Sequence, residues 1–485
     1  MVFSSLAFLF FFLPAVLLFF HAAPRWMRPA VLLLASLFFY FYGENYLVLV
    51  MLATAVIDYF CALMIAGGSS HPLREGGPRS RSQMAWLAVS IVSNLGLLGY
   101  FKYFHFFVEN LTAALADLGL AHWRLEGFVQ VALPLGISFY IFQAMSYTID
   151  VYRGHVAPCR SLLSFCTYIT MFPQLVAGPI VRYADIEGQI RAPRASLAQF
   201  AEGVRRFIGG FAKKVLLANP MGEVADGIFA LPDSEISTGI AWAGLLAYTL
   251  QIYFDFSGYS CMAIGLGKMF GFDFPENFNF PYIARSVRDF WHRWHITLST
   301  WFRDYVYFPL GGNRGTEFQT RRNLLIVFFT CGLWHGAGWN FVVWGLFHGL
   351  FLSLERTKFG AFLQEIPGVF RHVYLLLVVM VGWVFFRCET ASEAVLYLHR
   401  LLIFQGTEIR TVAEFLTPDV LFLMACGIVF SMPTVPSLRR RIEAWSGARK
   451  AAAEILSMAF LFGLFLLAVA SLTSGGYNPF IYFRF

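Results

Sequence analysis

Residues 323–352 read NLLIVFFTCGLWHGAGWNFVVWGLFHGLFL and contain no Asp, Glu, Lys or Arg. This uncharged apolar stretch is longer than the roughly 20 residues that a helix needs to cross the hydrocarbon core of a membrane. It therefore predicts a membrane-spanning helix. Near its middle lies His335, an ionisable side chain in an environment where such groups are energetically expensive.

The composition extends this prediction to the whole chain. Of 485 residues, 58% are hydrophobic and 13% are charged, which is not the composition of a soluble globular protein. We predict an all-α polytopic membrane protein, because helices satisfy their own backbone hydrogen bonds in lipid. The first apolar run lacks a preceding basic segment and a following cleavage site, so we expect a spanning helix rather than a removable signal. The predicted spans lie at about 3–20, 29–42, 45–66, 85–108, 127–150, 238–271, 323–356, 369–387, 416–432 and 452–473.

Charge and cysteine patterns exclude several other classes of protein. The formal net charge of +7 comes from basic residues in short loops between spans, so we expect contacts with membrane lipids and none with nucleic acid. The seven cysteines are scattered and form no C-x-x-C pair, which indicates neither a disulfide framework nor a zinc site. His292 and His295 have no carboxylate at ligand spacing, so we expect no metal.

The distribution of basic residues predicts the orientation in the membrane. Loops 21–28 and 67–84 both carry arginines and are separated by two predicted spans, so they lie on one side, which the positive-inside rule makes cytoplasmic. The cluster 439–441 places the start of the last span on the same side. We therefore expect the N-terminus and the tail, residues 475–485, to be extracytoplasmic.

Two segments are predicted to lie in the membrane without crossing it. Residues 164–183 are apolar but interrupted by Pro173 and Gly178-Pro179, which favours a re-entrant or interfacial element. In the next segment, apolar residues from Leu197 to Val215 recur at helical spacing, which predicts a helix lying on an anionic leaflet. Attraction of an anionic donor is the alternative role for its opposite face, which carries Arg205, Arg206, Lys213 and Lys214.

Polar side chains inside apolar segments mark the candidate site. Residues 285–305 read RSVRDFWHRWHITLSTWFRDY, and on one continuous helix the polar residues would step by three and four along one face, opposite an aromatic face. Such a stripe predicts the wall of a buried, water-accessible funnel. The candidate lining residues are Arg288, His292, His295, Ser299 and Arg303, together with Asp255 from the apolar segment 238–271.

His335 is the strongest candidate for chemistry. Gly332, Gly336 and Gly338 flank it and allow close backbone approach or a local break in the helix. An imidazole is the natural general base near neutral pH, although a histidine bonded to a neighbouring helix for structural reasons is the alternative. His348, further along the same stretch, is more typical of a packing residue. Secondary transport remains open from the residues alone, since buried polar groups also line transport paths.

Several motifs resemble the membrane-bound O-acyltransferases, in particular the AlgI/PatB-like bacterial branch that includes the alginate O-acetylation protein. They include LPLGISFYIFQAMSYTIDVYRG, YFDFSGYS, FPENFNF, RWHITLS and GLWHGAGWNFVVWGLFHG. The resemblance implies one domain over residues 1–485, with core motifs in 127–356. It implies about eleven transmembrane helices, plus re-entrant and interfacial helices, around a central funnel. His335 falls on the family's catalytic position and His295 on its second histidine, while Cys261 replaces the aspartate usual in this branch.

The aromatic tail is similar to a second motif. Its end, PFIYFRF, resembles the short motif of the companion peptide in lipoteichoic-acid D-alanylation, and Tyr482 matches the tyrosine thought to carry the acyl group there. An interfacial aromatic anchor is the alternative. Eight residues from Ser474 reach roughly 28 Å when extended, and half the hydrocarbon thickness is about 15 Å, so the tail is long enough to return to mid-membrane depth. Gly475 and Gly476 would supply the hinge.

These resemblances imply an inner-membrane O-acyltransferase. It would move an acyl group, expected to be acetyl, from a cytoplasmic thioester to the outside. Acetyl-CoA is the expected donor, and no bound cofactor is expected. Tyr482 would hand the acyl group to an extracytoplasmic SGNH-type partner, which modifies a polysaccharide. A non-catalytic transporter or flippase for a lipid-linked sugar is the alternative.

Overall fold

The computed structural model describes residues 2–120, 132–176, 178–191, 193–404, 409–479 and 481, and across these ranges the regular elements are all helical. The chain forms two compact units, Met1–Gly203 with Leu266–Pro275, and Val204–Gly265 with Glu276–Phe485. Helices α10 (Leu197–Ala212) and α12 (Thr238–Met269) run along the chain from one unit into the other.

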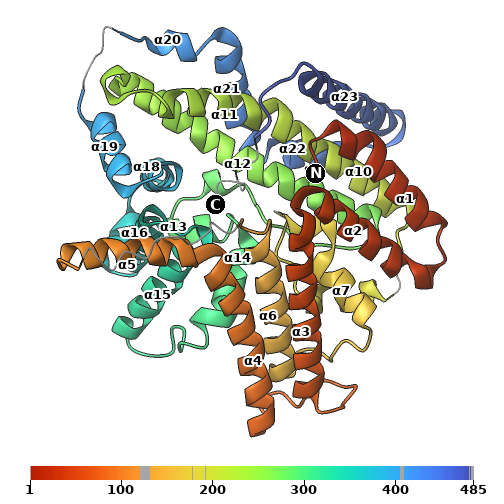
Figure 1. Cartoon of the computed structure of the whole chain (residues 1–485). Coiled ribbons are helices and arrows are strands. Elements are labelled where there is room, and N and C mark those ends of the chain that lie inside the picture. The colour runs from red at the N-terminus through yellow and green to blue at the C-terminus, as the bar shows by residue number, and fades with distance from the viewer. Residues whose placement is uncertain are drawn as a thin grey trace. The chain divides into compact units, whose positions relative to one another are not determined.

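The first unit is built around helices that run side by side in Figure 1, α3, α4 and α6. Its helices are α1 (Leu13–Ala22), α2 (Arg28–Glu44), α3 (Val48–Ala66), α4 (Arg81–Leu98), α5 (Phe104–Asp117), α6 (Ile137–Arg153), α7 (Leu162–Thr170), α8 (Phe172–Leu175) and α9 (Tyr183–Ile190).

A buried polar cluster joins α3, α4 and α6. The carboxylate of Asp58 accepts hydrogen bonds from Ser90 and Asn94, and the hydroxyl of Ser90 also contacts that of Thr148 at 2.8 Å. A buried carboxylate is costly unless it is hydrogen-bonded, so these contacts stabilise the packing of the three helices.

The second unit holds the remaining elements and every candidate site residue. Its helices are α11 (Asn219–Phe229), α13 (Val287–Trp291), α14 (Ile296–Phe302), α15 (Glu317–His335), α16 (Trp339–Leu354), α17 (Lys358–Glu365), α18 (Gly368–Arg387), α19 (Ala391–Leu402), α20 (Val412–Phe415), α21 (Pro418–Phe430), α22 (Thr434–Glu443) and α23 (Gly447–Thr473), with π-helical segments η6 (Lys213–Ala218) and η9 (Arg303–Tyr307).

The single span predicted over 323–356 is wrong, because the chain folds there into a helical hairpin. Helix α15 ends at His335 and α16 begins at Trp339, with Gly336 in extended backbone between them. A Cβ on Gly345 would lie 2.1 Å from the carbonyl oxygen of Phe328, and one on Gly332 would lie 2.3 Å from that of Phe341. Only glycine permits this close approach, which is why the two helices pack directly against each other.

Several of the other predicted spans match helices that are long and apolar enough to cross a membrane. Within the described ranges four segments meet that condition, or five if the bent pair α21 and α22 forms one span. The four are Arg25–Ala66, Arg81–Asp117, Gly368–Arg387 and Gly447–Thr473. The protein is therefore a polytopic helical membrane protein, while the number of eleven helices remains a prediction. The broken element predicted after residue 163 is observed as two short helices, α7 and α8, that meet at Met171.

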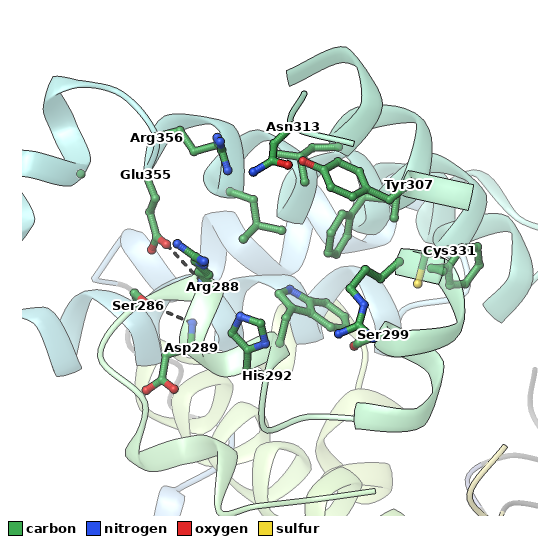
Figure 2. Close-up of a pocket in the computed structure, with 18 of the residues that line it drawn as sticks. Ser286, Arg288, Asp289, His292, Ser299, Tyr307, Asn313, Cys331, Glu355 and Arg356 are labelled. Carbon is green, nitrogen blue, oxygen red and sulfur yellow. Dashed lines mark hydrogen bonds between the residues drawn. The ribbon is translucent and has the colours of Figure 1, made fainter. Parts of the chain in front are cut away.

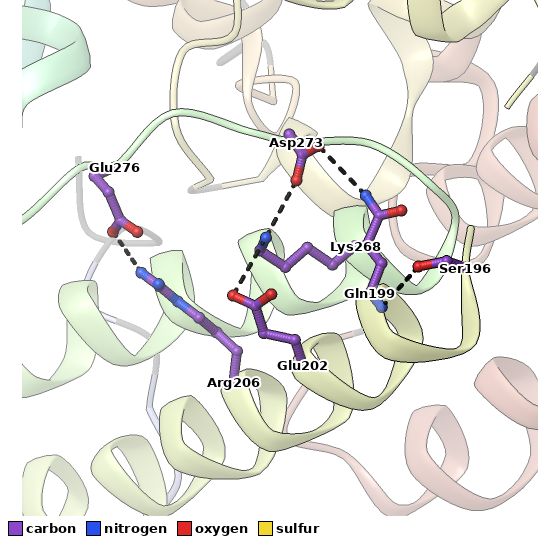
Figure 3. A network of polar contacts seen from close by, with 7 residues as sticks. All are labelled: Ser196, Gln199, Glu202, Arg206, Lys268, Asp273 and Glu276. Atoms are coloured by element: carbon purple, nitrogen blue, oxygen red, sulfur yellow. Dashed lines mark hydrogen bonds and ion pairs between the residues drawn. The ribbon is translucent and has the colours of Figure 1, made fainter. Parts of the chain in front are cut away.

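Just after α10, the surroundings of a basic residue differ from the predicted lipid-facing position. Lys214 is buried, with its side chain only 2% exposed, and it pairs with Asp255 instead of facing an anionic leaflet. Figure 3 shows that Arg206 pairs with Glu276 in the second unit. Figure 3 also shows Lys268 bound to Glu202 and Asp273 in the first. Protein carboxylates therefore engage Arg206 and Lys214, two of the four cations that the sequence pattern assigned to the lipid surface.

Candidate active site

His335 lies at the carboxyl end of α15 inside a shell of aromatic rings. Its imidazole centre is 4.9 Å from that of Trp334, 5.0 Å from that of Trp344 and 5.1 Å from that of Phe386. The side chain is buried, and the three rings meet it nearly edge to face. These rings exclude water and hold the imidazole in a low-dielectric environment, where electrostatic interactions are stronger than in water.

The continuous polar helix predicted over 288–303 is wrong, and the error matters for His295. The chain turns between α13 and α14, and His295 takes a left-handed backbone conformation with φ of +43°. This turn carries His295 away from the stripe and buries it completely, while His292 remains exposed. The two histidines therefore have different surroundings.

Asn277 holds His295 in this conformation. Its Oδ1 lies 3.1 Å from Nδ1 of His295 and also accepts from the hydroxyl of Thr297 at 2.9 Å. Its backbone carbonyl accepts from the backbone N–H of Ile296, and its side-chain amide donates to the hydroxyl of Ser260. These contacts hold the proton of a neutral His295 on Nδ1, which makes Nε2 the basic nitrogen.

Reasoning from the sequence missed Asn277 as a site residue. It stands within the FPENFNF motif. However, an asparagine in a loop has no helical or alternating pattern that would mark it. Only the turn before α14 brings it against His295.

The two histidines lie close to each other. Their ring centres are 6.4 Å apart, and the rings are inclined at 61°. The structure therefore brings together the two residues that the resemblance marked as catalytic.

His335 lines a small apolar cavity with room for about one water molecule. The other lining residues are Ile252, Phe256, Trp294, Trp344, Trp383, Phe386 and Ile481. His335 is the titratable side chain among them. Ile481 is notable because it belongs to the C-terminal tail, 146 residues later in the chain than His335 by their numbers (481 − 335).

A much larger cavity of about 790 Å³ approaches the same site from elsewhere in the second unit. Four residues of the predicted stripe lie on its wall: Arg288, His292, Ser299 and Arg303. Figure 2 shows Arg288, His292 and Ser299 along one side, with Arg356, Asn313 and Tyr307 opposite. Three further arginines line it, Arg285, Arg356 and Arg371.

The large cavity ends close to His335. Cys331 is on its wall and precedes His335 by four residues on α15, about one helical turn or 6 Å along the axis. Trp291 lies on the same wall, and its ring centre is 5.7 Å from that of Trp344, which lines the small cavity. A tryptophan from the wall of each cavity therefore packs against the other.

Asp255 is not on either cavity wall. It is buried in α12, 2.7 Å from Nζ of Lys214, and its other oxygen accepts the backbone N–H of Ile481 at 2.8 Å. Its place on the wall of a funnel therefore stays a prediction. It contacts the tail instead.

The tail leaves α23 and returns into the second unit. Gly475 has a left-handed backbone (φ +75°), which is where the predicted hinge would turn the chain. Tyr477 then donates a hydrogen bond to Asp226, and Ile481 is buried at 5% exposure. Tyr482 is the next residue of the chain and lies outside the described residues.

Cys261 and His348 have surroundings that the sequence did not specify. Nζ of Lys213 lies 3.6 Å from Sγ of Cys261, so a thiol stands beside a cation at the position where the resemblance implies a carboxylate.

His348 packs against Trp291 and Trp344, and a Cβ on Gly382 would lie 2.8 Å from its Nε2. His348 therefore fills an aromatic core position, as expected of a packing residue.

Comparison with known proteins now bears on this site. Residues 155–391 match the family model described as MBOAT, membrane-bound O-acyltransferase family. The chain is 41% identical to the probable alginate O-acetylase AlgI of Azotobacter vinelandii over 515 aligned positions, which cover both chains completely. The chain belongs to the membrane-bound O-acyltransferase family. Both site histidines fall inside the part matched by the family model.

More distant relatives of this membrane-bound O-acyltransferase differ in the polymer they are named for. The peptidoglycan O-acetyltransferase of Helicobacter pylori is 33% identical over 90% of this chain and 86% of its own. The teichoic acid D-alanyltransferase of Streptococcus thermophilus is 30% identical over 46% of this chain and 56% of its own. The family shows that the protein is an O-acyltransferase, so the flippase alternative is not supported.

Proposed function

We propose that this O-acyltransferase moves an acetyl group from cytoplasmic acetyl-CoA across the inner membrane to the hydroxyl of Tyr482. From there an extracytoplasmic SGNH-type partner passes it to a polysaccharide. Relatives named for acetylation of alginate and peptidoglycan support both the acetyl group and a polysaccharide as the indirect acceptor.

The observation that carries this proposal is the position of Ile481. This residue lines the same small cavity as His335 and precedes Tyr482 by one peptide unit, about 3.8 Å between Cα atoms. An aromatic interfacial anchor would not require the tail to return into the protein core. Burial of Ile481 beside His335 therefore favours a substrate arm over an anchor.

In the proposed reaction, His335 takes the proton from the phenolic oxygen of Tyr482 as that oxygen attacks the thioester carbonyl. A C–O bond forms, the C–S bond breaks, and the departing thiolate takes the proton from His335. The phenol has a pKa near 10, close to the 8.5 or so of a thiol, so the tyrosyl ester keeps much of the activation of the thioester. It can therefore pass the acetyl group onward.

His295 has the supporting role in this scheme. Because Asn277 accepts from Nδ1, the neutral ring presents a basic Nε2 and serves to orient His335 or share its proton. Polarisation of the carbonyl would need a second N–H and is the less favoured role.

The large cavity supports entry of an anionic donor. Five arginines and His292 line it, against Asp289 and Glu355. Glu355 already accepts the backbone N–H groups of Val287 and Arg288 at the start of α13. The remaining positive charge suits the phosphates of coenzyme A, since Arg forms strong bidentate contacts with phosphate.

The decisive experiment compares Tyr482→Phe with the wild-type enzyme in the absence of a partner protein. Purified enzyme is incubated with labelled acetyl-CoA, and the C-terminal peptide is analysed by mass. The wild-type peptide should gain one acetyl group, sensitive to hydroxylamine, and Tyr482→Phe should gain none. Tyr46→Phe, at an exposed tyrosine of the first unit, is the matched control and should behave as wild type.

A wild-type peptide that never gains acetyl mass, together with acetyl export by Tyr482→Phe in cells, would contradict the carrier role. His335 would then act on an acceptor hydroxyl from another protein.

A further inference from the structure

We propose that Lys214 and Asp255 form a clamp that binds the backbone of the C-terminal tail and sets its register at the His335 cavity. This inference rests on the proposed function, because it assigns positioning residues to the acyl-accepting arm. The ligand of the clamp is a peptide backbone that offers a carbonyl oxygen and, two residues later, an N–H.

The clamp consists of an ion pair that is complete only with the tail. Lys214 of η6 and Asp255 of α12 are 2.7 Å apart, and each side chain is only 2% exposed. Lys214 donates to the carbonyl oxygen of Pro479, and Asp255 accepts the N–H of Ile481. One bond therefore holds a backbone carbonyl and the other a backbone N–H, on either side of residue 480.

Burial of the ion pair makes its hydrogen bonds to the tail important for stability. Taking two charges out of water is unfavourable, and mutual attraction offsets this only when further hydrogen bonds satisfy the remaining polar atoms. Here the tail provides one such bond to each partner. The pair therefore offers one donor and one acceptor to polar backbone groups inside an otherwise apolar core.

Neighbouring contacts extend the same register along the tail. Asn219 donates to the side chain of Asn478 at 3.2 Å. Tyr477 donates to Asp226, which also pairs with Arg387 at 2.7 Å. Consecutive tail residues therefore meet successive polar groups.

A slip by one residue would break this whole series. It would also carry Ile481 out of the cavity that it shares with His335.

Lys214 and Asp255 line neither cavity, so they act through the tail rather than on the reacting atoms. Misplacement of a reacting group by about 1 Å can lower a rate on the order of 100-fold. Loss of the clamp should therefore lower the rate of tail acetylation about 100-fold, while the KM for acetyl-CoA remains unchanged because the arginine-lined cavity is intact.

The test measures where the tail lies and how fast it is acetylated. Ile481→Cys is introduced into the full-length enzyme, with the two partly exposed cysteines, Cys261 and Cys426, replaced by serine. The double variant Lys214→Met with Asp255→Leu removes both buried charges together, a change that is often tolerated in protein cores. It should expose residue 481 to a thiol reagent and slow acetylation of Tyr482 in the matching chain without Ile481→Cys.

Three comparisons separate a clamp from a structural ion pair. Lys214→Arg keeps a donor and should retain the buried tail. The exchange Lys214→Asp with Asp255→Lys keeps an ion pair but reverses its polarity toward the backbone, so it should release the tail. Lys213→Met alters the neighbouring lysine, which has no described contact with the tail, and should leave residue 481 protected.

Equal labelling of residue 481 in wild type and in the Met/Leu double variant would overturn the clamp, as would full protection in the exchange variant. The outcome is distinct from failure of the carrier role. If the double variant releases the tail while Tyr482→Phe still exports acetyl groups, the clamp stands and the carrier role is wrong.

Discussion

At His335, the surroundings decide what the imidazole can do. Three aromatic rings lie within 5.1 Å of it and exclude water. Among the described residues that line the small cavity, His335 is the titratable one, and it shares that cavity with the tail residue Ile481. A base in such a place acts on a substrate proton without competition from solvent. The same shell explains why replacement of the imidazole should affect chemistry more than folding.

We expect His335→Ala to lower acetyl transfer by about 10²–10⁴-fold, the range typical of a lost general base. His335→Gln keeps a hydrogen-bonding side chain of similar size but cannot take the proton, so it should be equally inactive. Transfer is measured with labelled acetyl-CoA in purified enzyme. Wild-type rates in a well-expressed His335→Gln enzyme would rule out the role of base.

Asn277 offers a second test among single residues. Asn277→Ala removes the acceptor for Nδ1 of His295 and for the hydroxyl of Thr297, so His295 should lose its fixed tautomer and orientation. We expect a loss of rate on the order of 100-fold with little change in the KM for acetyl-CoA. Asn279→Ala, two residues away on the same loop, is the control. Equal losses in both variants would indicate a general effect on the loop.

Among the elements, the hairpin of α15 and α16 positions His335, the proposed general base. The helices touch through Gly332 and Gly345, and His335 is the last residue of α15 before the turn. Any residue with a side chain at these contacts must push the helices apart.

Gly345→Ala should therefore destabilise the protein by about 1–3 kcal/mol, the usual cost of overpacking, because its Cβ would lie 2.1 Å from the carbonyl oxygen of Phe328. A lower midpoint of thermal unfolding in detergent would show this. Gly463→Ala in α23 meets no atom within 4 Å and is the matched control. An unchanged midpoint in Gly345→Ala would mean that the hairpin can open at no cost.

The elements also show which helices the sequence patterns predict correctly and which they do not. Apolar length correctly predicts the helices around residues 29–66, 85–108 and 369–387, because lipid imposes the same requirement on each. It fails at 336–338, where glycines in extended backbone end a helix inside an unbroken apolar run. The polar stripe over 288–303 fails for a related reason. Helical spacing assumes a continuous helix, and the left-handed residue His295 interrupts it.

The pairing of charges could not be predicted from spacing at all. Lys214 has the helical position of a surface residue, but its partner Asp255 is 41 residues away by number (255 − 214) in another helix. His335 was predictable because an ionisable residue near the middle of a long, largely apolar stretch is conspicuous. Asn277 was not, because its role depends on a turn.

For the whole molecule, the predicted orientation in the membrane gives a direct test. Single cysteines at Ser70 and Ser474, both exposed, should react with an impermeant thiol reagent from opposite sides. Reaction of both from one side would overturn the orientation and, with it, delivery of the acetyl group to the outside.

The return of the tail into the core has a kinetic consequence. An acceptor tethered to its own enzyme reacts as an intramolecular group, so the first turnover should proceed at the same rate however far the enzyme is diluted. If Tyr482 is the acyl carrier and the tail is held as proposed above, each chain can load a single acetyl group before the arm must leave the ion pair of Lys214 and Asp255 to be emptied. Release of the tail, rather than acetyl transfer to it, would then limit the steady-state rate. A rise in acetyl-CoA beyond saturation would not increase that rate.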